Sequence, residues 1–509
     1  MIDLTIAEIA DIVGGELTDV SAADAQRTHV TGTVEFDSRA ITSGGLFLAL
    51  PGARSDGHDH AVAAVAAGAV AVLAARPVGV PAIVVRPDVG NRAATGASVL
   101  EHDKDGSGSA VLTALARLAA EVARRLVARG LTVVGVTGSS GKTSTKDLLA
   151  AVLAPLGEVV APPGSFNNEL GHPWTVLRAT EDTDYLILEM SARRRGNIAE
   201  LAAIAPPRVA VVLNVGTAHL GEFGSREAIA ETKAELPQAV PETGVVVLNA
   251  DDATVAAMAD KTRARVVRVS RSDAGADLFA DDVTLDELAR PRFTLRYRDD
   301  SAPVRLAVHG DHQVSNALCA AAVALECGAS VAQVADALAG AGPVSKHRMA
   351  VSTRADGVTV VNDAYNANPD SMRAGLRALA WMARSSGEAG GEKRRSFAVL
   401  GEMAELGDDT ISEHDGVGRL AVRLDVTRLV VVGTGRPMSA MHHGAVMEGS
   451  WGSEVSQVSD ADAALELLRT ELRPGDVVLV KASNSAGLGA LAERLAGESG
   501  AVPGGEPAR

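Results

Sequence analysis

The sequence is poor in aromatic side chains, which make up 3% of its 509 residues. Its hydrophobic cores must therefore be built from Ala, Val and Leu. Basic residues are outnumbered as well, because 48 Lys and Arg stand against 64 Asp and Glu, a formal net charge of −16. Non-specific affinity for nucleic acid comes from positive surface charge. This balance excludes a general nucleic-acid binder, although a local basic pocket for a small phosphate ligand is compatible with it.

Cysteines and long apolar runs are also scarce. The two cysteines, Cys319 and Cys327, share one Ala-rich stretch and fit no common metal-binding spacing, so we expect reduced residues of a helix. The longest apolar run covers the 15 residues 61–75, whereas a bilayer span needs about 20. The N-terminus carries acids where a signal peptide needs basic residues. We therefore expect a soluble, cytoplasmic protein without membrane insertion.

Short continuous runs of Val, Ile and Leu alternate with amphipathic segments through most of the chain. Such runs are typical of strands that are covered on both faces, and helices between them indicate a doubly wound, mostly parallel sheet. The predicted class is therefore α/β. The runs lie at 132–136, 185–188, 209–213, 244–248, 397–400, 429–432 and 477–480, with helices predicted over 142–153, 226–236 and 461–472.

Composition breaks divide the chain into three parts. The charged, Gly/Ser-rich segment 101–109 indicates a linker, and GAGP at 340–343 follows a helical pattern. At about 150 residues per domain, the length also suggests three domains. We predict a small N-terminal α/β domain over residues 1–105, a central phosphate-loop domain over 106–341 and a C-terminal Rossmann-like domain over 342–509.

The strongest local motif is GSSGKTS, which lies between a predicted strand and a predicted helix. Small residues allow backbone N–H groups to close around phosphate oxygens, and the helix N-terminus adds its dipole. Lys142 is expected on the β- and γ-phosphates, and the Thr143 hydroxyl on Mg²⁺. The spacing departs from the usual G-x-x-x-x-G-K-[ST], because position 136 is Val. The expected nucleotide-binding residues here are Gly138, Ser139, Ser140, Gly141, Lys142, Thr143 and Ser144.

Further polar residues follow the next strands. Glu189 ends a strand, where a carboxylate faces the ligand crevice of such a sheet and can ligate Mg²⁺. His219 follows another strand and can ligate a metal as neutral imidazole, although a hydrogen-bonded loop histidine is the more ordinary interpretation. Lys233 lies in the helix predicted over 226–236, where ion pairs on a solvated helix face would be equally ordinary.

The later polar residues fall near the second domain boundary. Asp311 is placed to cap an Ala-rich helix, and His312 and Asn316 share one face of it, where they can meet a base. Arg348 lies just past the boundary, from which it can reach a γ-phosphate across a cleft. The polar string at 361–371 follows a strand, as a binding loop does.

Together these motifs resemble those of the Mur ligases over nearly the whole chain. The string DAYNANPDS is the most specific, and it resembles the member that adds a dipeptide rather than the member that adds the third residue. The segments that carry the resemblance are Asp37-Ser38-Arg39, residues 44–47 and 56–58, GSSGKTS, residues 167–171 with Pro173, Glu189, residues 218–220, Lys233, and residues 363–371 and 401–407.

The resemblance implies ATP-dependent addition of D-alanyl-D-alanine to UDP-N-acetylmuramoyl-tripeptide through an acyl phosphate, which yields the pentapeptide precursor of peptidoglycan. It implies ATP as co-substrate, two Mg²⁺ ions and small-molecule substrates only, and we expect a monomer. The implied catalytic residues are Lys142, Glu189, His219, Lys233 and Arg348. Metal ligands would be Thr143, Glu189, His219 and a carbamylated Lys233. Asn316 would contact adenine, Arg348 the γ-phosphate and Asp363 the ribose, and Ser38, Arg39, Asn167, Asn168, Glu169, Asn366 and Asn368 would contact the other substrates.

Two departures from the family pattern and several alternatives accompany this hypothesis. Lys233 is followed by Ala-Glu where the family often has Gly-Glu, and three arginines stand at 193–195 where fewer are usual. One alternative is a sibling amide ligase that adds another amino acid or acts on folate. A nucleotide-binding switch would leave the motifs at 37–39 and 56–58 unexplained. A dinucleotide-binding protein built on residues 433–435 lacks the third glycine, because position 438 is Met.

Overall fold

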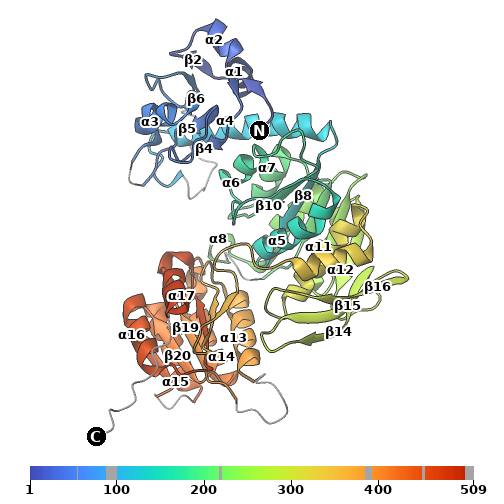
Figure 1. Cartoon of the computed structure of the whole chain (residues 1–509), viewed down its shortest axis with the longest axis vertical. Helices are drawn as coiled ribbons and strands as arrows, with labels where there is room; N and C mark the ends of the chain where they lie inside the picture. Colours follow the sequence, from blue (N-terminus) through green and yellow to red (C-terminus); the bar gives the residue numbers. More distant parts are fainter. Residues whose placement is uncertain (54, 88–99, 217–219, 385–392, 450–452, 499–509) are drawn as a thin grey trace.

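The computed structural model describes residues 1–53, 55–87, 100–216, 220–384, 393–449 and 453–498. Within them, three α/β units follow one another along the long axis of the molecule (Figure 1). The chain begins in the unit at the top of this view, passes through the middle unit and ends in the unit at the bottom. The expected α/β class is confirmed.

The N-terminal unit is built on a five-stranded sheet. Its strands lie in the order β2 (Glu16–Thr18), β7 (Ala82–Val84), β6 (Ala69–Ala74), β5 (Gly45–Leu48) and β4 (Val34–Glu35). The long apolar run 61–75 is divided between α3 (Ala61–Ala66) and β6, because Gly68, at φ +122°, turns the chain between them. The remaining elements are β1 (Leu4–Thr5), α1 (Ile6–Val13), α2 (Ala22–Arg27), β3 (His29–Val30) and η1 (Gly57–His60).

Helix α4 (Ser107–Val127) joins the N-terminal unit to the middle one. It packs against α1 on one side and against α6 (Gly171–Val176) and α7 (Asn197–Ile204) on the other. It begins inside the segment 101–109, so the prediction of a linker there is wrong for its last residues. The carboxylate of Asp103 accepts the backbone N–H groups of Gly108 and Ser109 and so holds the first turn.

The middle unit contains a nine-stranded sheet. Its strands lie in the order β16 (Asp300–Arg305), β15 (Pro291–Tyr297), β14 (Leu278–Leu285), β13 (Arg265–Ser270), β12 (Val245–Asn249), β11 (Val209–Val212), β8 (Thr132–Thr137), β10 (Tyr185–Glu189) and β9 (Val159–Val160). Pairs from β9 to β14 are parallel, and β15 and β16 extend the sheet antiparallel. The four strands predicted here are confirmed to within one residue, whereas β9, β13, β14 and the antiparallel extension were not predicted.

Helices cover both faces of the middle sheet, as a doubly wound fold requires. Successive strand residues enter different cores: Val133 faces the core shared with α4, and Val134 faces the core under α5 and α11. The helices of the unit are α5 (Lys142–Leu153), α8 (Leu220–Phe223), α9 (Arg226–Ala239), α10 (Ala253–Ala256), α11 (Gln313–Glu326) and α12 (Val331–Gly340), with η3 (Ala154–Leu156) and η4 (Ala257–Lys261).

The C-terminal unit is a second layered domain. Its sheet has the order β17 (Ala350–Thr353), β18 (Thr359–Asn362), β22 (Val477–Lys481), β19 (Ser396–Leu400), β20 (Arg428–Val432) and β21 (Val455–Val458), and β17 alone is antiparallel. One face carries α13 (Pro369–Arg384), α14 (Thr410–Arg423) and α15 (Arg436–Met447), and the other carries α16 (Ala461–Glu471) and α17 (Leu488–Gly497). Two short helices complete it, η5 (Gly407–Asp409) and η6 (Asn484–Ala486). The expected Rossmann-like architecture is confirmed.

Both cysteines are free, as predicted. Cys319 is fully buried in α11, and Cys327 lies at the C-terminal end of that helix. Burial raises the pKa of the Cys319 thiol to about 12 and that of Cys327 to about 11. In the described part of the chain, no helix combines the length and apolarity that a membrane crossing requires.

Candidate active site

A cavity of about 1020 Å³ lies between the middle and C-terminal units, at the carboxyl ends of the middle strands. Both units contribute to its wall, which is the arrangement expected for a ligand crevice in an open α/β sheet. The predicted site residues that line it are Ser139, Ser140, Gly141, Lys142, Thr143, Ser144, Asn167, Asn168, Glu169, Glu189, Asn316, Arg348, Asp363, Asn366 and Asn368.

The phosphate loop follows β8 and turns into α5 at Gly141, which has φ +84°. A β-carbon at Gly141 would stand 2.7 Å from Oδ1 of Asn316, so only glycine fits here. Asn214 closes the other side: its Oδ1 accepts the Ser140 N–H at 2.9 Å, and its Nδ2 donates to the Ser140 carbonyl at 3.1 Å. Asn214 was not predicted, although its place directly after the strand β11 was a signal of the same kind as that of Glu189.

Lys142 points back into its own loop. Its Nζ donates to the Gly138 carbonyl at 2.6 Å. Burial lowers the pKa of Lys142 below its ordinary value; the carboxylate of Glu189 opposes this effect, and the positive charge of Arg348 adds to it. Lys142 and Arg348 therefore place two positive charges at one cavity, which a bound polyphosphate would stabilise.

Glu189 is the centre of a buried hydrogen-bond network. It ends β10 with an exposed fraction of 1%. Its Oε2 accepts the Thr143 hydroxyl at 3.1 Å, while its Oε1 accepts Ser165 Oγ at 3.0 Å and Asn167 Nδ2 at 2.7 Å. The structure thus brings the predicted residues Thr143, Glu189 and Asn167 together. Ser165 was not predicted, since nothing in its sequence neighbourhood marks it.

These oxygens suit a magnesium ion. A hydroxyl and a carboxylate are donors that Mg²⁺ accepts, with phosphate oxygens and water completing its shell. Among the described residues, no group of three or more His, Cys, Asp or Glu side chains is arranged to hold a metal by itself. The metal-ligand prediction for His219 falls outside the described residues, which resume at residue 220 after a gap at 217–219.

Lys233 is buried in α9 with an exposed fraction of 7%. The alternative of a solvated helix face is therefore wrong. Burial lowers the pKa of Lys233 well below its ordinary value, and the positive charge of Lys142 adds to this effect. The neighbouring Glu235 faces elsewhere: it accepts the backbone N–H groups of Gly196 and Ala199 at the start of α7.

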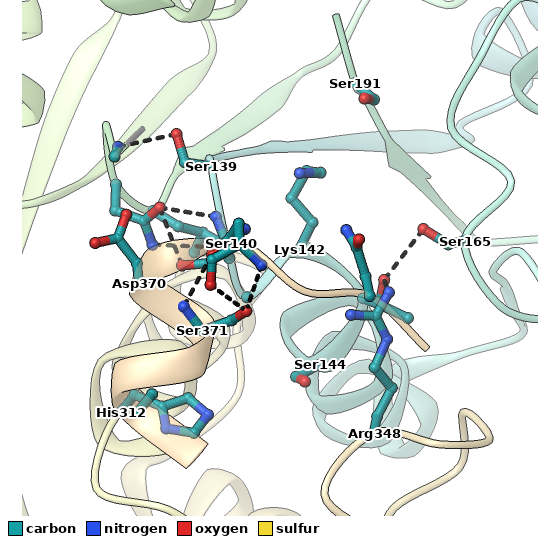
Figure 2. A pocket seen from close by; sticks show the side chains of 18 of the residues that line it. Ser139, Ser140, Lys142, Ser144, Ser165, Ser191, His312, Arg348, Asp370 and Ser371 are labelled. Atoms are coloured by element: carbon teal, nitrogen blue, oxygen red, sulfur yellow. Dashed lines mark hydrogen bonds between the residues drawn. The ribbon is translucent and has the colours of Figure 1, made fainter. Parts of the chain in front are cut away.

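The C-terminal unit contributes a cation and a buried ion pair. Arg348 lies beside α5 (Figure 2), with one guanidinium nitrogen 3.3 Å from the Thr143 hydroxyl and its Cζ 4.3 Å from the centre of the Tyr365 ring. Asp363 follows β18, and its Oδ2 lies 2.6 Å from Nζ of Lys481. Arg348 therefore reaches the phosphate-loop helix from the C-terminal unit, and Asp363 lines the same cavity.

At the other end of the cavity, Asn316 is buried in α11, and its Nδ2 donates to Gln313 Oε1 at 2.9 Å. The expected capping role of Asp311 is wrong. Residue His312 occupies the N-cap position without a side-chain cap, and Asp311 instead pairs with Arg271 at 2.5 Å. Asp311 pairs with Arg271 instead of capping the helix, because Arg271, 40 residues away in the sequence, lies at the same end of α11.

Several predicted substrate residues also have structural roles. Asn168 Oδ1 accepts the Gly171 N–H and starts α6, while Asn368 Oδ1 accepts the Ser371 N–H and starts α13. Asn197 donates to Glu169 at 3.3 Å, and Asn366 is exposed. Ser38 and Arg39 lie in the N-terminal unit and do not line this cavity, and Arg39 pairs with Asp37 at 2.7 Å.

The chain matches three described protein-family domains. Residues 31–120 match the catalytic domain of the Mur ligase family, residues 136–324 the Mur ligase middle domain, and residues 347–484 the Mur ligase glutamate ligase domain. Together these matches cover all three units.

Individual proteins of this family are similar to the chain over nearly its whole length. The UDP-N-acetylmuramoyl-tripeptide--D-alanyl-D-alanine ligase of Mycobacterium tuberculosis H37Rv is 73% identical over 506 residues, which cover 97% of this chain and 98% of that protein. The Escherichia coli K12 protein of the same name is 32% identical over 491 residues, with 96% and 97% covered. Among solved structures, MurF from Acinetobacter baumannii has a TM-score of 0.79 at 28% identity, with 97% of this chain and 99% of that chain covered. MurF from Thermotoga maritima, solved in complex with ADP, has a TM-score of 0.73 at 28% identity, with 92% and 97% covered.

Proposed function

The chain belongs to the Mur ligase family, and on this basis we propose that it joins D-alanyl-D-alanine to UDP-N-acetylmuramoyl-tripeptide at the expense of ATP. The product is the pentapeptide precursor of peptidoglycan. The observation that carries the proposal is that residues of the DAYNANPDS loop, the most specific part of the resemblance, line the same cavity as the phosphate loop. The switch and dinucleotide-binding alternatives explain neither this arrangement nor the whole-length identity.

The terminal carboxylate of the tripeptide is a poor electrophile and must be activated before an amine can attack it. The terminal carboxylate of the tripeptide attacks the γ-phosphorus of ATP, which breaks the bond to ADP and forms an acyl phosphate. The amine of D-alanyl-D-alanine then adds to the acyl carbon, and the tetrahedral intermediate collapses to an amide and inorganic phosphate. The amine proton leaves to a base, and no net oxidation occurs.

The residues of the cavity address the main barrier, which is repulsion between an anionic carboxylate and an anionic γ-phosphate. Lys142 and Arg348 approach the phosphate position from two domains and offset negative charge that develops on transfer. Asn316 and Asp363 line the same cavity from the middle and C-terminal units. Asn316 is assigned to the adenine of ATP, and Asp363 to its ribose. Ligands held from two domains are oriented for attack.

Magnesium fits the residues present. Thr143 and Glu189 would hold it beside the β- and γ-phosphates, and a bound Mg²⁺ supplies Lewis-acid neutralisation of phosphate charge. His219 and Lys233 are the proposed holders of a second ion. The lowered pKa of Lys233 supports this assignment, because a neutral amine can add to CO₂ and release one proton, which leaves a carbamate with carboxylate-like oxygens.

Other parts of the proposal concern the whole protein. Ser38 and Arg39 belong to the proposed uridine-nucleotide site of the N-terminal domain, and Asn167, Asn168, Glu169, Asn366 and Asn368 to the sites of the peptide substrates. We assign domain limits at 1–105, 106–341 and 342–509. Because the reaction uses ATP, we place it in the cytoplasm, and we propose that the protein acts as a monomer.

The test is phosphate release from ATP with UDP-N-acetylmuramoyl-tripeptide fixed and the amine varied among D-alanyl-D-alanine, single amino acids and none. Strong dependence on the dipeptide is expected. Dependence on another amine would move the chain to a sibling ligase, and release that is unaffected by any amine would overturn the proposal.

A further inference from the structure

The linker, residues 341–349, connects α12 to β17 and carries Arg348 into the cavity. The residues on either side of Arg348 have a left-handed backbone, with φ +57° at His347 and +48° at Met349. Residues other than glycine rarely adopt this conformation, and it persists only where surrounding contacts fix it. The contacts that fix the linker therefore decide where the Arg348 guanidinium lies.

The C-terminal domain supplies one set of contacts. Asp363 Oδ1 accepts the Met349 N–H at 3.1 Å, and the Tyr365 N–H donates to the His347 carbonyl at 3.2 Å. The Tyr365 ring lies under the guanidinium of Arg348. These contacts hold the linker to its own domain, but they do not relate it to the phosphate loop.

Helix α5 supplies the other set. Asp147 Oδ2 accepts the Ser345 N–H at 3.1 Å, and Lys146 Nζ donates to Ser345 Oγ at 3.3 Å. Lys146 also donates to the Pro162 carbonyl at 2.9 Å and lies 2.5 Å from Asp147 Oδ1. Three acceptors thus surround an ammonium group that has three N–H donors. Lys146 is buried, with an exposed fraction of 3%, so this arrangement is shielded from water.

The position of Lys146 and Asp147 along α5 connects the linker to the phosphate loop. Lys146 and Asp147 follow Lys142 and Thr143 by about one helical turn, so the helix that follows the phosphate loop also holds the linker. Neither of them lines the cavity, and neither does Ser345. Their influence on a bound nucleotide must pass through another residue, and Arg348 lies three residues along the linker from Ser345.

We propose that Lys146, Asp147 and Ser345 form a linker anchor, a set of positioning residues that sets Arg348 against the phosphate loop. The proposal rests on the proposed function, because Arg348 is taken to meet the γ-phosphate of ATP. It assigns the anchor to the phosphoryl-transfer step rather than to nucleotide affinity, since Lys142 and the loop backbone hold the nucleotide independently.

The first experiment compares Ser345→Ala with wild type, using D-alanyl-D-alanine-dependent phosphate release. We expect kcat to fall between about tenfold and 100-fold, the range for a misplaced positioning group, while KM for ATP stays near wild type. Ser345→Thr keeps the hydroxyl and is expected to retain kcat. Ser352→Ala on the neighbouring strand β17, where the side chain is exposed, is the matched control. A rise in KM for ATP at constant kcat would overturn the proposal.

The second experiment separates positioning from general stability. Ser345→Ala and Asp147→Asn are each combined with Arg348→Ala, and their melting temperatures are recorded alongside kcat. If the anchor acts through Arg348, adding either change to Arg348→Ala has little further effect on kcat. Losses that add in full would overturn the proposal, as would a kcat loss that simply follows a lowered melting temperature.

The two proposals fail in different ways. Wild-type enzyme that shows no dipeptide-dependent phosphate release would contradict the proposed function, whatever the variants do. Wild-type enzyme with the expected activity, together with a fully active Ser345→Ala, would contradict the linker anchor alone.

Discussion

The ammonium group of Lys481 lies 2.6 Å from Oδ2 of Asp363, and the exposed fractions of the two side chains are 2% and 12%. Asp363 in turn accepts the Met349 N–H, so this pair supports the residue next to Arg348. Burial lowers the pKa of Lys481, while the carboxylate of Asp363 opposes that effect. Removing the charge of either Lys481 or Asp363 would leave the other charge buried without a counter-ion.

Lys481→Met is expected to lower the free energy of unfolding of the C-terminal domain by about 3 kcal/mol or more, the usual cost of breaking a buried ion pair. The control is Lys393→Met, which breaks the more exposed pair with Asp425 and should change stability little. Urea unfolding followed by circular dichroism measures both. Equal effects of the two substitutions would contradict the importance of burial.

Gly141→Ala is expected to weaken ATP binding by at least about tenfold, because a side chain disfavours the left-handed backbone and would also press on Oδ1 of Asn316. Calorimetric titration with a non-hydrolysable ATP analogue gives the affinity. The control is Gly130→Ala, at a glycine that also has positive φ but has open space around it and lies outside the cavity. Unchanged affinity in Gly141→Ala would refute the loop assignment.

Lys233→Ala is expected to be inactive and to recover part of its activity when a small carboxylate such as acetate is added, because the carboxylate can replace the carbamate oxygens. Lys142→Ala is the control, since a missing cation should not be replaced by an anion. Phosphate release is measured for both over a range of acetate concentrations. Rescue of both variants, or of Lys142→Ala alone, would contradict the two roles.

His172 predicts a pH dependence of stability. It is fully buried in α6. Burial lowers the pKa of His172 to about 4, from an ordinary value of 6.5, although backbone groups of Leu201 and Glu189 act in the opposite direction. Between these values the unfolded chain binds more protons, so the free energy of unfolding falls as pH drops from about 6.5 towards 4, by roughly 3 kcal/mol at most.

The measurement is the urea midpoint at pH 7 and at pH 5 for wild type and for His172→Leu. The variant should lose less stability on acidification. His443→Leu, at a histidine with an exposed side chain, serves as control and should follow wild type. A wild-type slope retained in His172→Leu would show that other groups cause the pH dependence.

Sequence patterns predicted the four central strands of the middle sheet well, because a strand covered on both faces reads as a continuous run such as the Val-rich segment of β8. Strands β14 to β16, at one side of this sheet, were not predicted. Their apolar residues alternate with polar ones, and Arg and Asp on the exposed side hide the pattern.

Site residues that belong to a sequence motif were predicted, whereas those brought to the site only by the fold were missed. Lys142 belongs to the GSSGKTS motif and Glu189 ends a continuous apolar run, and both signals are visible in the sequence. Ser165 and Asn214 act through hydrogen bonds whose partners come from distant segments. The burial of Lys233 was also hidden, since charged neighbours on its helix indicate solvent exposure. Long-range contacts of this kind leave no periodic signal in one sequence.

The shared core around α4 has a thermodynamic consequence. Residues of the N-terminal unit, of α4 and of the middle sheet belong to one continuous apolar cluster. The C-terminal unit has two clusters on the faces of its own sheet, and the middle unit adds only Ala289 and Leu285 to one of them. The first two units should therefore melt as a single cooperative block, and the third as another. Calorimetry would then resolve two transitions for three domains, and a nucleotide bound in the crevice between the blocks would merge them.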